Sequence, residues 1–274
     1  MNRALSGKFL SISVTAWLFN SLNNLLYLSL DLEIKEQIII SYMDSLKRIL
    51  ITLFVGMMLQ FPVLGQANTT KQVADTLRYK QNPNYDYELG LYKVYKKKRA
   101  DLVMLGNSIT HGVNWNELLG RDNVVERGIP ADILQGMFAR LNYVYDLQPR
   151  VVCIMGGIND IYNWAPTDEI FSNYKKIIDA LREKKIKVIV QSTLYVAKRY
   201  QSSPDRNGEV EKLNKQLAAY CKSNNIEFLD LNAKISKERF LRDEVTHDGL
   251  HLNANGYKIW GEELDKVLRR YFIY

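Results

Sequence analysis

The sequence predicts an α/β protein: a three-layer α/β/α sandwich with a five-stranded parallel sheet between two layers of helices. Short apolar runs of strand length alternate with longer segments whose apolar residues recur at helical spacing. Strands and helices that alternate in this way form right-handed βαβ units and a parallel sheet. The runs occupy residues 102–106, 123–128, 150–157, 187–193 and 226–231, and the helical segments occupy 131–146, 167–184, 207–224 and 254–271.

The composition is that of an ordinary globular protein, with 47% hydrophobic and 24% charged residues. The net charge of +7 is spread out, because lysines and arginines alternate with acidic residues along the predicted helices. The one concentrated basic run, 96–99, has no interleaved aromatic residues, so we expect no nucleic-acid partner. Cys153 and Cys221 lack the spacing of a metal-binding motif. We therefore expect no metal site built on cysteine.

The region before the sheet contains the three parts of a secretory signal peptide. Lys47 and Arg48 precede an unbroken apolar stretch at 49–59, and a segment suited to cleavage follows at 63–65. This order and size predict a signal peptide over residues 43–65. The protein would then be exported, to the periplasm or outside the cell, without a stable membrane span in the mature chain. The alternative is an uncleaved segment that anchors the protein in a membrane.

The position of this signal suggests that Met43 is the true start. Residues 1–42 would then be an upstream extension that is not normally translated. Residues 66–99 form a polar lead-in segment, within which the tyrosine-rich stretch 85–99 has helical spacing. The predicted sheet and its helices lie in residues 100–274, which is enough chain for one domain with a sizeable core.

Polar residues follow the carboxyl ends of several predicted strands. Ser108 comes after the first strand, Gly128 ends the second, Asn159 follows the third, and Asp248 and His251 come after the fifth. In an open parallel sheet these ends meet at one edge, where ligands bind. Taken alone, Ser108 could simply cap the following helix. The set of residues at one edge favours a reactive serine.

The residue types fit nucleophilic catalysis. A serine hydroxyl attacks a carbonyl when an imidazole accepts its proton and a carboxylate orients that imidazole. Asp248 and His251 are three residues apart, so a single turn can bring them together while the ring faces Ser108. The oxyanion needs positioned donors, which the backbone N–H groups of Ser108 and Gly128 and the side-chain amide of Asn159 would supply. We therefore predict Ser108, Asp248 and His251 as the catalytic triad.

Other residues near these motifs are predicted to form the pocket wall, while Asn107 or Thr110 caps the helix that Ser108 begins. His247 is expected to be exposed or to support the triad from outside. The predicted wall consists of Asn107, His111, Trp115, Ile129, Ile158 and Trp164.

The motifs GNSIT around Ser108, Gly128, GIND at 157–160 and DGLH at 248–251 resemble, in order and approximate spacing, the four motif blocks of the SGNH (GDSL-type) hydrolases. The resemblance covers about residues 100–270. It departs at Asn107, where the family name has Asp, and at Ile158, where a smaller polar residue is common. The resemblance implies a flavodoxin-like sheet of order 2-1-3-4-5, an SGNH hydrolase catalytic domain over 100–274, and hydrolysis of carboxylic esters without metal or cofactor.

The short connections between strands and helices leave no room for a cap domain, so we expect an open site. Such a site favours a small acyl group on a bulky alcohol, and with export this predicts an O-acetylesterase acting on carbohydrate. The alternative substrate class is lipid, for a lysophospholipase or a short-chain lipid acylhydrolase. An alternative of another kind is a catalytically silent module that binds a glycan or a protein.

Overall fold

The computed structural model describes residues 78–271 and, before them, residues 31, 32, 34–37, 39–41, 43–45 and 47. The chain divides into two compact units, 1–72 and 73–274. The described residues of the first unit are helical from Leu32 onward. None of the helices in the described parts of the chain is long and apolar enough to cross a membrane. The apolar stretch and cleavage segment of the predicted signal peptide lie outside the described residues.

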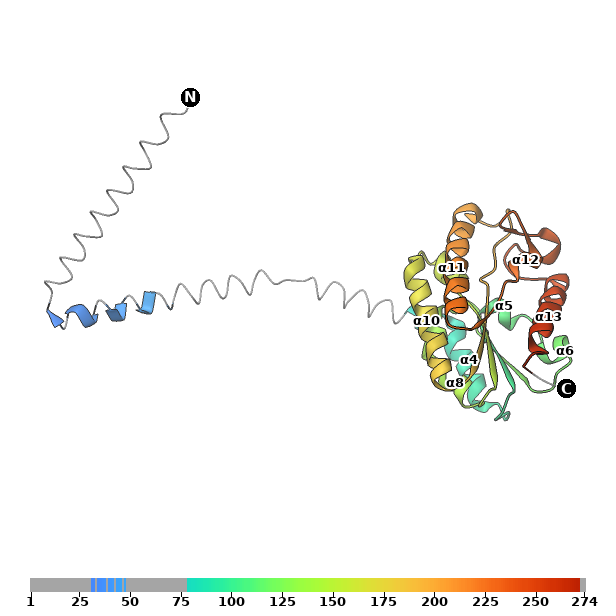
Figure 1. The fold of residues 1–274 in the computed structure, drawn as a ribbon, viewed down its shortest axis with the longest axis horizontal. Helices are drawn as coiled ribbons and strands as arrows, with labels where there is room; N and C mark the ends of the chain where they lie inside the picture. The colour runs from blue at the N-terminus through green and yellow to red at the C-terminus, as the bar shows by residue number, and fades with distance from the viewer. Residues whose placement is uncertain are drawn as a thin grey trace, which may run out of the picture. The chain divides into compact units, whose positions relative to one another are not determined.

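The second unit contains the predicted parallel sheet (Figure 1). Its strand order is β2-β1-β3-β4-β5, and every neighbouring pair is parallel. This confirms the predicted order 2-1-3-4-5. The strands are β1 (Leu102–Gly106), β2 (Val124–Gly128), β3 (Val151–Met155), β4 (Lys187–Gln191) and β5 (Glu227–Leu229).

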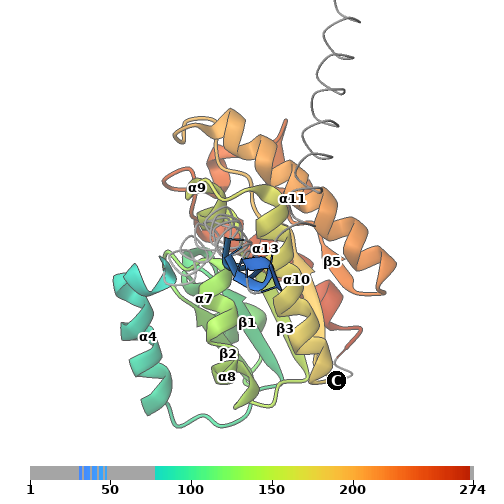
Figure 2. The same ribbon diagram turned by 90° about the vertical axis from the view of Figure 1, so that its left-hand side faces the viewer.

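Helices cover both faces of the sheet, as the two perpendicular views show (Figures 1 and 2). On one face α10 packs against both α7 and α11, and on the other face α13 packs against α6. This confirms the three-layer sandwich. The helices of the first face are α7 (Leu134–Ala139), α8 (Asn142–Tyr145), α10 (Thr167–Glu183) and α11 (Ser203–Ser223), and those of the second are α6 (Trp115–Leu119) and α13 (Ala254–Leu268).

Burial explains why the strands read as unbroken apolar runs. Every residue of β1 and β3 is buried, because helices cover both sides of these central strands. Helix α10 instead buries one stripe, with Ile170, Tyr174, Ile177 and Leu181 inward at helical spacing. On the second face, the rings of Trp115 and Trp260 meet edge to face at 4.7 Å and join α6 to α13.

Helices α11 and α13 differ from their predicted bounds by up to four residues, since α11 begins at Ser203 and α13 ends at Leu268, and two other predicted helices differ more. The segment predicted as one helix over 131–146 is two short helices, α7 and α8, because Arg140 leaves the helical conformation between them and buries its guanidinium. The helix predicted over 85–99 is α4 (Pro83–Val94), which Asn82 caps through its side chain. Its buried Tyr85 and Tyr92 form a small second core with Ile129, at the end of β2.

The remaining elements are short and occupy the connections. Near the carboxyl edge of the sheet, α5 (Ser108–His111) follows β1 and α9 (Ile158–Tyr162) follows β3. Helix α12 (Asn232–Ile235), the two-stranded pair β6 (Ser236–Lys237) and β7 (Phe240–Leu241), and the 3-10 turns at Arg78–Gln81 and Asp243–Val245 complete the described part of this unit.

Candidate active site

Ser108 is the first residue of α5, directly after β1. Asn107 caps this helix, because its side-chain oxygen accepts the N–H of Ile109 at 3.0 Å. The capping role predicted for Asn107 is therefore confirmed, and the Ser108 hydroxyl is left for other contacts. The backbone turns tightly here, since a Cβ on Gly106 would lie 2.8 Å from the Met155 carbonyl oxygen. Glycine is needed where the end of β1 passes this close to β3, just before Ser108.

The turn from Asp248 to His251 is fixed by its own hydrogen bonds. One carboxylate oxygen of Asp248, Oδ1, accepts the backbone N–H groups of Leu250 at 2.8 Å and His251 at 2.7 Å. Gly249 has a φ of +95°, in the left-handed region that favours glycine. Thr246 closes the turn by accepting the N–H of Gly249 at 2.9 Å. The sequence DGLH thus folds so that the aspartate reaches the histidine three residues on.

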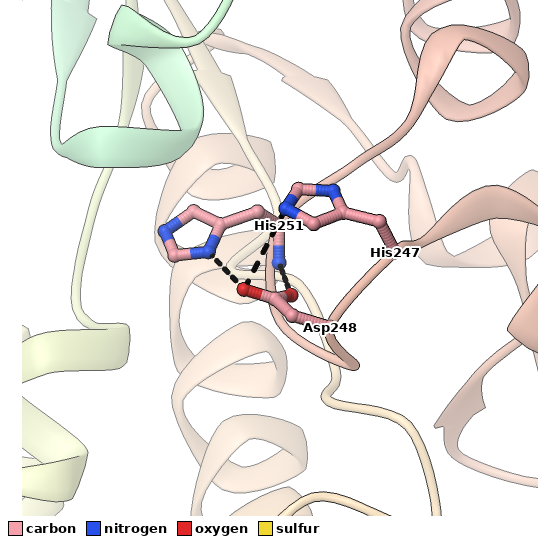
Figure 3. Close-up of side chains that lie close together, drawn as sticks. All are labelled: His247, Asp248 and His251. Atoms are coloured by element: carbon pink, nitrogen blue, oxygen red, sulfur yellow. Dashed lines mark hydrogen bonds and ion pairs between the residues drawn. The ribbon is translucent and has the colours of Figure 1, made fainter.

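The turn places His251 between Asp248 and Ser108. His251 Nδ1 lies 2.6 Å from Asp248 Oδ2, and His251 Nε2 lies 2.9 Å from Ser108 Oγ. Figure 3 shows the first of these contacts, with His247 on the other side of the carboxylate. A serine, an imidazole and a carboxylate in this sequence of contacts can transfer the serine proton to the imidazole. The structure therefore brings the three predicted triad residues together.

The electrostatics of the turn keep Asp248 ionised. Burial alone raises the pKa of this carboxyl, but the hydrogen bonds from the His251 ring and from the Leu250 and His251 N–H groups outweigh burial. The pKa of Asp248 is lowered to about 2. A carboxylate in this state stabilises a protonated imidazole beside it.

Gly128 ends β2 against the first turn of α5. A Cβ on Gly128 would lie 2.6 Å from the Asn107 carbonyl oxygen and 2.6 Å from the His111 backbone nitrogen. Only glycine permits this contact, so the predicted donor N–H of Gly128 lies next to the helix that Ser108 begins. That N–H donates to the carboxylate of Glu126.

Asn159, the third predicted oxyanion donor, lies in the first turn of α9. Its Nδ2 donates to the Asp132 carbonyl oxygen at 2.8 Å, which fixes the orientation of the amide. The amide has two N–H groups, so one remains for a substrate oxygen. Asp160, the next residue, is buried and accepts the N–H of Leu134 at 3.2 Å. Burial raises the pKa of Asp160 to about 7.

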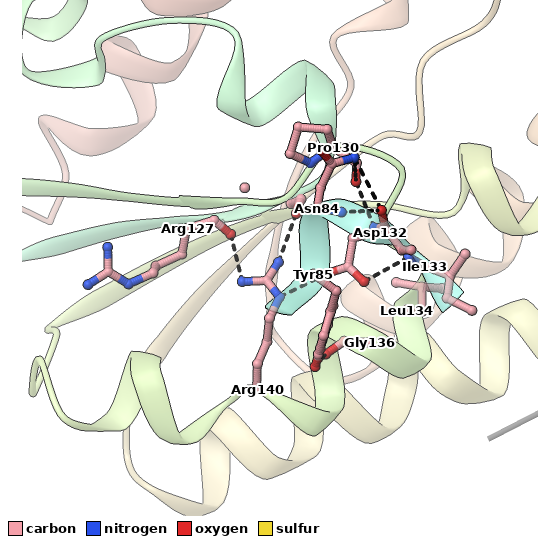
Figure 4. A network of polar contacts seen from close by, with 12 residues as sticks. Asn84, Tyr85, Arg127, Pro130, Asp132, Ile133, Leu134, Gly136 and Arg140 are labelled. Atoms are coloured by element: carbon pink, nitrogen blue, oxygen red, sulfur yellow. Dashed lines mark hydrogen bonds and ion pairs between the residues drawn. The ribbon is translucent and has the colours of Figure 1, made fainter. Parts of the chain in front are cut away.

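A buried arginine that the sequence analysis missed connects these parts (Figure 4). The guanidinium of Arg140 donates to Asp132 Oδ2 at 2.8 Å, to the Arg127 carbonyl at 3.0 Å and to the Gly106 carbonyl at 2.9 Å. Arg140 thus joins the ends of β1 and β2 to the residue that holds Asn159. The sequence signal for this arginine is weak: a basic residue three positions after the apolar Met137, within a predicted helix.

Four predicted wall residues are instead part of the interior, and these predictions are wrong. Trp115 is 1% exposed because its ring packs on Trp260 and its Nε1 donates to the Thr110 carbonyl. Ile129 lies beneath α4 and Ile158 belongs to the main core. Asn107 is buried in its capping role.

The other two predicted wall residues are at the surface. The His111 ring has Nδ1 3.5 Å from Glu126 Oε2 and Nε2 3.9 Å from Glu88 Oε1. The hydrogen bond with Glu126 raises the pKa of His111, and burial raises the pKa of Glu88. Trp164 is exposed and stacks on the guanidinium of Arg206, 3.1 Å from the ring centroid.

His247 is exposed, as predicted, and lies outside the Ser108–His251–Asp248 series of contacts. Its Nε2 is 3.8 Å from Asp248 Oδ2, and its ring is stacked on that of His251 at 6.0 Å (Figure 3). In the described part of the chain, His247, Asp248 and His251 also form a group whose ligand atoms all lie within 4.8 Å of one another. His251 already contacts both Asp248 and Ser108. We therefore assign His251 and Asp248 to proton transfer and not to metal binding.

A serine beside a histidine–aspartate pair, at the carboxyl edge of a five-stranded parallel sheet, defines a hydrolase of the serine type. A family model described as the GDSL-like lipase/acylhydrolase family matches residues 104–259, more than half of the chain. The chain belongs to this family. Its fold is the one that the resemblance implies.

Solved structures and curated relatives are similar to the chain to different extents. A GDSL-like lipase from Bacteroides thetaiotaomicron superposes with a TM-score of 0.61 and 26% identity, covering 69% of this chain and 98% of that one. A lipase/acylhydrolase from Enterococcus faecalis shares the fold, with a TM-score of 0.54 and 22% identity over 63% of this chain and 96% of that one. N-acylneuraminate cytidylyltransferases of Streptococcus agalactiae are 29% identical over 175 residues, or 64% of this chain. The chain spans only 40% of the length of these relatives.

Proposed function

We propose that Ser108 is the nucleophile of an esterase that works through an acyl-enzyme. Its hydroxyl attacks the ester carbonyl while His251 Nε2 takes the proton, and the Asp248 carboxylate stabilises the imidazolium. The oxyanion accepts hydrogen bonds from the N–H groups of Ser108 and Gly128 and from the Asn159 amide. His251 then gives its proton to the leaving alcohol oxygen as the bond to the carbonyl carbon breaks.

The second half of the reaction uses the same groups in reverse. A water molecule gives its proton to His251 and attacks the acyl carbon, and Ser108 leaves with the proton from the imidazolium. The observation that carries this proposal is the pair of contacts at His251, 2.9 Å to Ser108 Oγ and 2.6 Å to Asp248 Oδ2.

The test is hydrolysis of p-nitrophenyl acetate by the wild type and by Ser108→Ala. Loss of the triad nucleophile is expected to lower kcat by about 10⁶-fold, to the background that the remaining donors provide. Ser108→Ala with wild-type activity would overturn the assignment. A folded wild type that hydrolyses no ester would favour a silent module that binds a glycan or a protein.

We further propose that the acyl group is short, most simply an acetyl group. Trp115, Ile129 and Ile158, three aliphatic and aromatic residues that were predicted for the pocket wall beside the motifs, are at most 3% exposed. Their side chains therefore offer a long acyl chain no surface to bury against, and burial is the main source of affinity for such a chain. An acetyl group needs little apolar surface.

For the alcohol we propose a carbohydrate, which supports an O-acetylesterase. The triad is open to large alcohols, since the side chains of His251 and Asp248 are 32% and 40% exposed. Polar groups, including those of His111, Glu126 and His247, lie around it. Such groups can exchange hydrogen bonds with the hydroxyls of a sugar, whereas a lipid tail gains nothing from them.

Two release assays with one enzyme preparation separate the substrate classes. Acetate released from acetylated glycans is measured beside fatty acid released from lysophospholipid, with Ser108→Ala as the blank in both. We expect acetate release to be the faster by kcat/KM. Faster release of fatty acid would replace the carbohydrate proposal with a lysophospholipase or a short-chain lipid acylhydrolase.

A further inference from the structure

Glu126 is a charged residue at the proposed oxyanion site that the mechanism above does not use. It lies on β2, two residues before Gly128, so its side chain lies on the side of the strand to which a Cβ at Gly128 would point. One carboxylate oxygen, Oε1, accepts the N–H of Gly128, and the other, Oε2, lies 3.5 Å from His111 Nδ1. The side chain is 26% exposed. It is therefore accessible from the site.

This contact conflicts with binding of a substrate in the proposed mechanism. A backbone N–H is a single donor, so it cannot serve the Glu126 carboxylate and a substrate oxyanion at full strength together. Two negatively charged oxygens at one donor would also repel each other. The carboxylate must therefore leave the Gly128 N–H before the reaction reaches its tetrahedral intermediate.

The surroundings show where the displaced carboxylate can go. His111 already faces the second oxygen of Glu126, and its ring can hold the carboxylate after Gly128 is released. Beyond the ring is Glu88, 3.9 Å from His111 Nε2 and only 6% exposed, so the carboxylate cannot move farther that way without like-charge repulsion. The displaced group therefore stays beside the reacting carbonyl. There, one of its oxygens needs a new donor to replace the N–H.

We propose that Glu126 is a specificity-determining residue that selects esters carrying a nearby hydroxyl group. In the free enzyme it occupies the Gly128 donor, and it yields that donor to a substrate whose own hydroxyl bonds to the displaced carboxylate. An acetylated polyol supplies this hydroxyl and a simple aryl acetate does not. This inference rests on the proposed function, because it assumes that Gly128 serves the oxyanion.

The experiment compares Glu126→Gln and Glu126→Ala with the wild type on two acetate esters. One substrate is p-nitrophenyl acetate, which has no hydroxyl, and the other is a monoacetylated sugar. Removing the carboxylate is expected to raise kcat/KM about tenfold on the aryl ester, because the Gly128 donor becomes free. The same change is expected to lower kcat/KM about tenfold on the acetylated sugar, which loses its acceptor. Glu126→Gln, which keeps the shape, is expected to shift both values in the same directions by less.

Glu183→Gln is the matched control, since it removes an exposed carboxylate at the end of α10. Its two kcat/KM values are expected to equal those of the wild type. A parallel fall on both substrates in the Glu126 variants would overturn the inference and leave Glu126 as a support for Gly128. Unchanged values on both substrates would also overturn it. If the proposed function itself were wrong, the result would be different: wild type and Ser108→Ala would hydrolyse each ester equally slowly.

Discussion

The substitution Gly128→Ala tests how closely β2 must approach α5. The added Cβ would lie 2.6 Å from the Asn107 carbonyl oxygen and 2.6 Å from the His111 nitrogen, whereas ordinary contact begins at 3.4 Å. The nearest atom, Glu126 Oε1 at 2.5 Å, belongs to a side chain that can move away, but the other two are backbone atoms. The strand end and the helix must therefore separate by about 0.8 Å. A hydrogen bond from the Gly128 N–H to the oxyanion, normally about 2.9 Å long, would be lost if it were lengthened by this amount.

Loss of one oxyanion donor lowers kcat by roughly 100- to 1000-fold. We therefore expect this fall for Gly128→Ala in steady-state hydrolysis of p-nitrophenyl acetate, with a smaller change in KM. Overpacking is expected to lower the free energy of unfolding by about 1–3 kcal/mol, measured by urea denaturation. Gly208→Ala in α11 is the control, because a Cβ there meets nothing within 4 Å. A folded Gly128→Ala with kcat within about threefold of the wild type would refute the reasoning on this donor.

Three further predictions concern the framework and the charge of the site. Arg140→Met leaves the Asp132 carboxylate buried and unpaired, so the free energy of unfolding in urea is expected to fall by about 3–5 kcal/mol; a loss below about 1 kcal/mol would contradict this. Asp248→Asn is expected to lower kcat by about 10⁴-fold. Because the pKa of Asp248 is lowered to about 2, its stabilising effect is present above the ordinary carboxyl pKa of 3.8 and is lost as the pH falls through about 2. Unfolding of the wild type and Asp248→Asn should therefore differ at neutral pH and converge in acid, and a gap independent of pH would be inconsistent with this. Trp115→Ala is expected to cost about 3–5 kcal/mol of unfolding free energy and to leave KM unchanged, whereas a residue of the pocket wall would change KM.

The sheet could be predicted because its signal is local. Each strand is a short apolar run between turn residues, and the family motifs mark the strand ends. The predicted ends of the first two strands, Gly106 and Gly128, are those of the structure. Helix bounds were less accurate where burial overrides the local pattern. The break at Arg140 depends on carbonyl oxygens 13 and 34 residues away in the chain, which no local pattern contains.

The triad contacts follow from sequence for a related reason. Asp248 and His251 meet within one turn, and the fold brings that turn to Ser108. The residues of the pocket wall could not be predicted from the sequence, because proximity to a motif does not show which way a side chain faces. Trp115 and Ile158 follow motif residues closely, yet both are buried in the main core. Glu126 was missed because its importance lies in one backbone N–H, which has no signature in the sequence.

Covalent labelling of Ser108 tests the central claim most directly. A fluorophosphonate reacts with a serine whose proton an adjacent imidazole accepts, and it forms a stable analogue of the acyl-enzyme. Mass spectrometry of the digested protein at neutral pH is expected to find one phosphonyl group, on the peptide containing Ser108, and none in Ser108→Ala. An unmodified Ser108 peptide in enzyme that the reagent has inactivated would contradict the account.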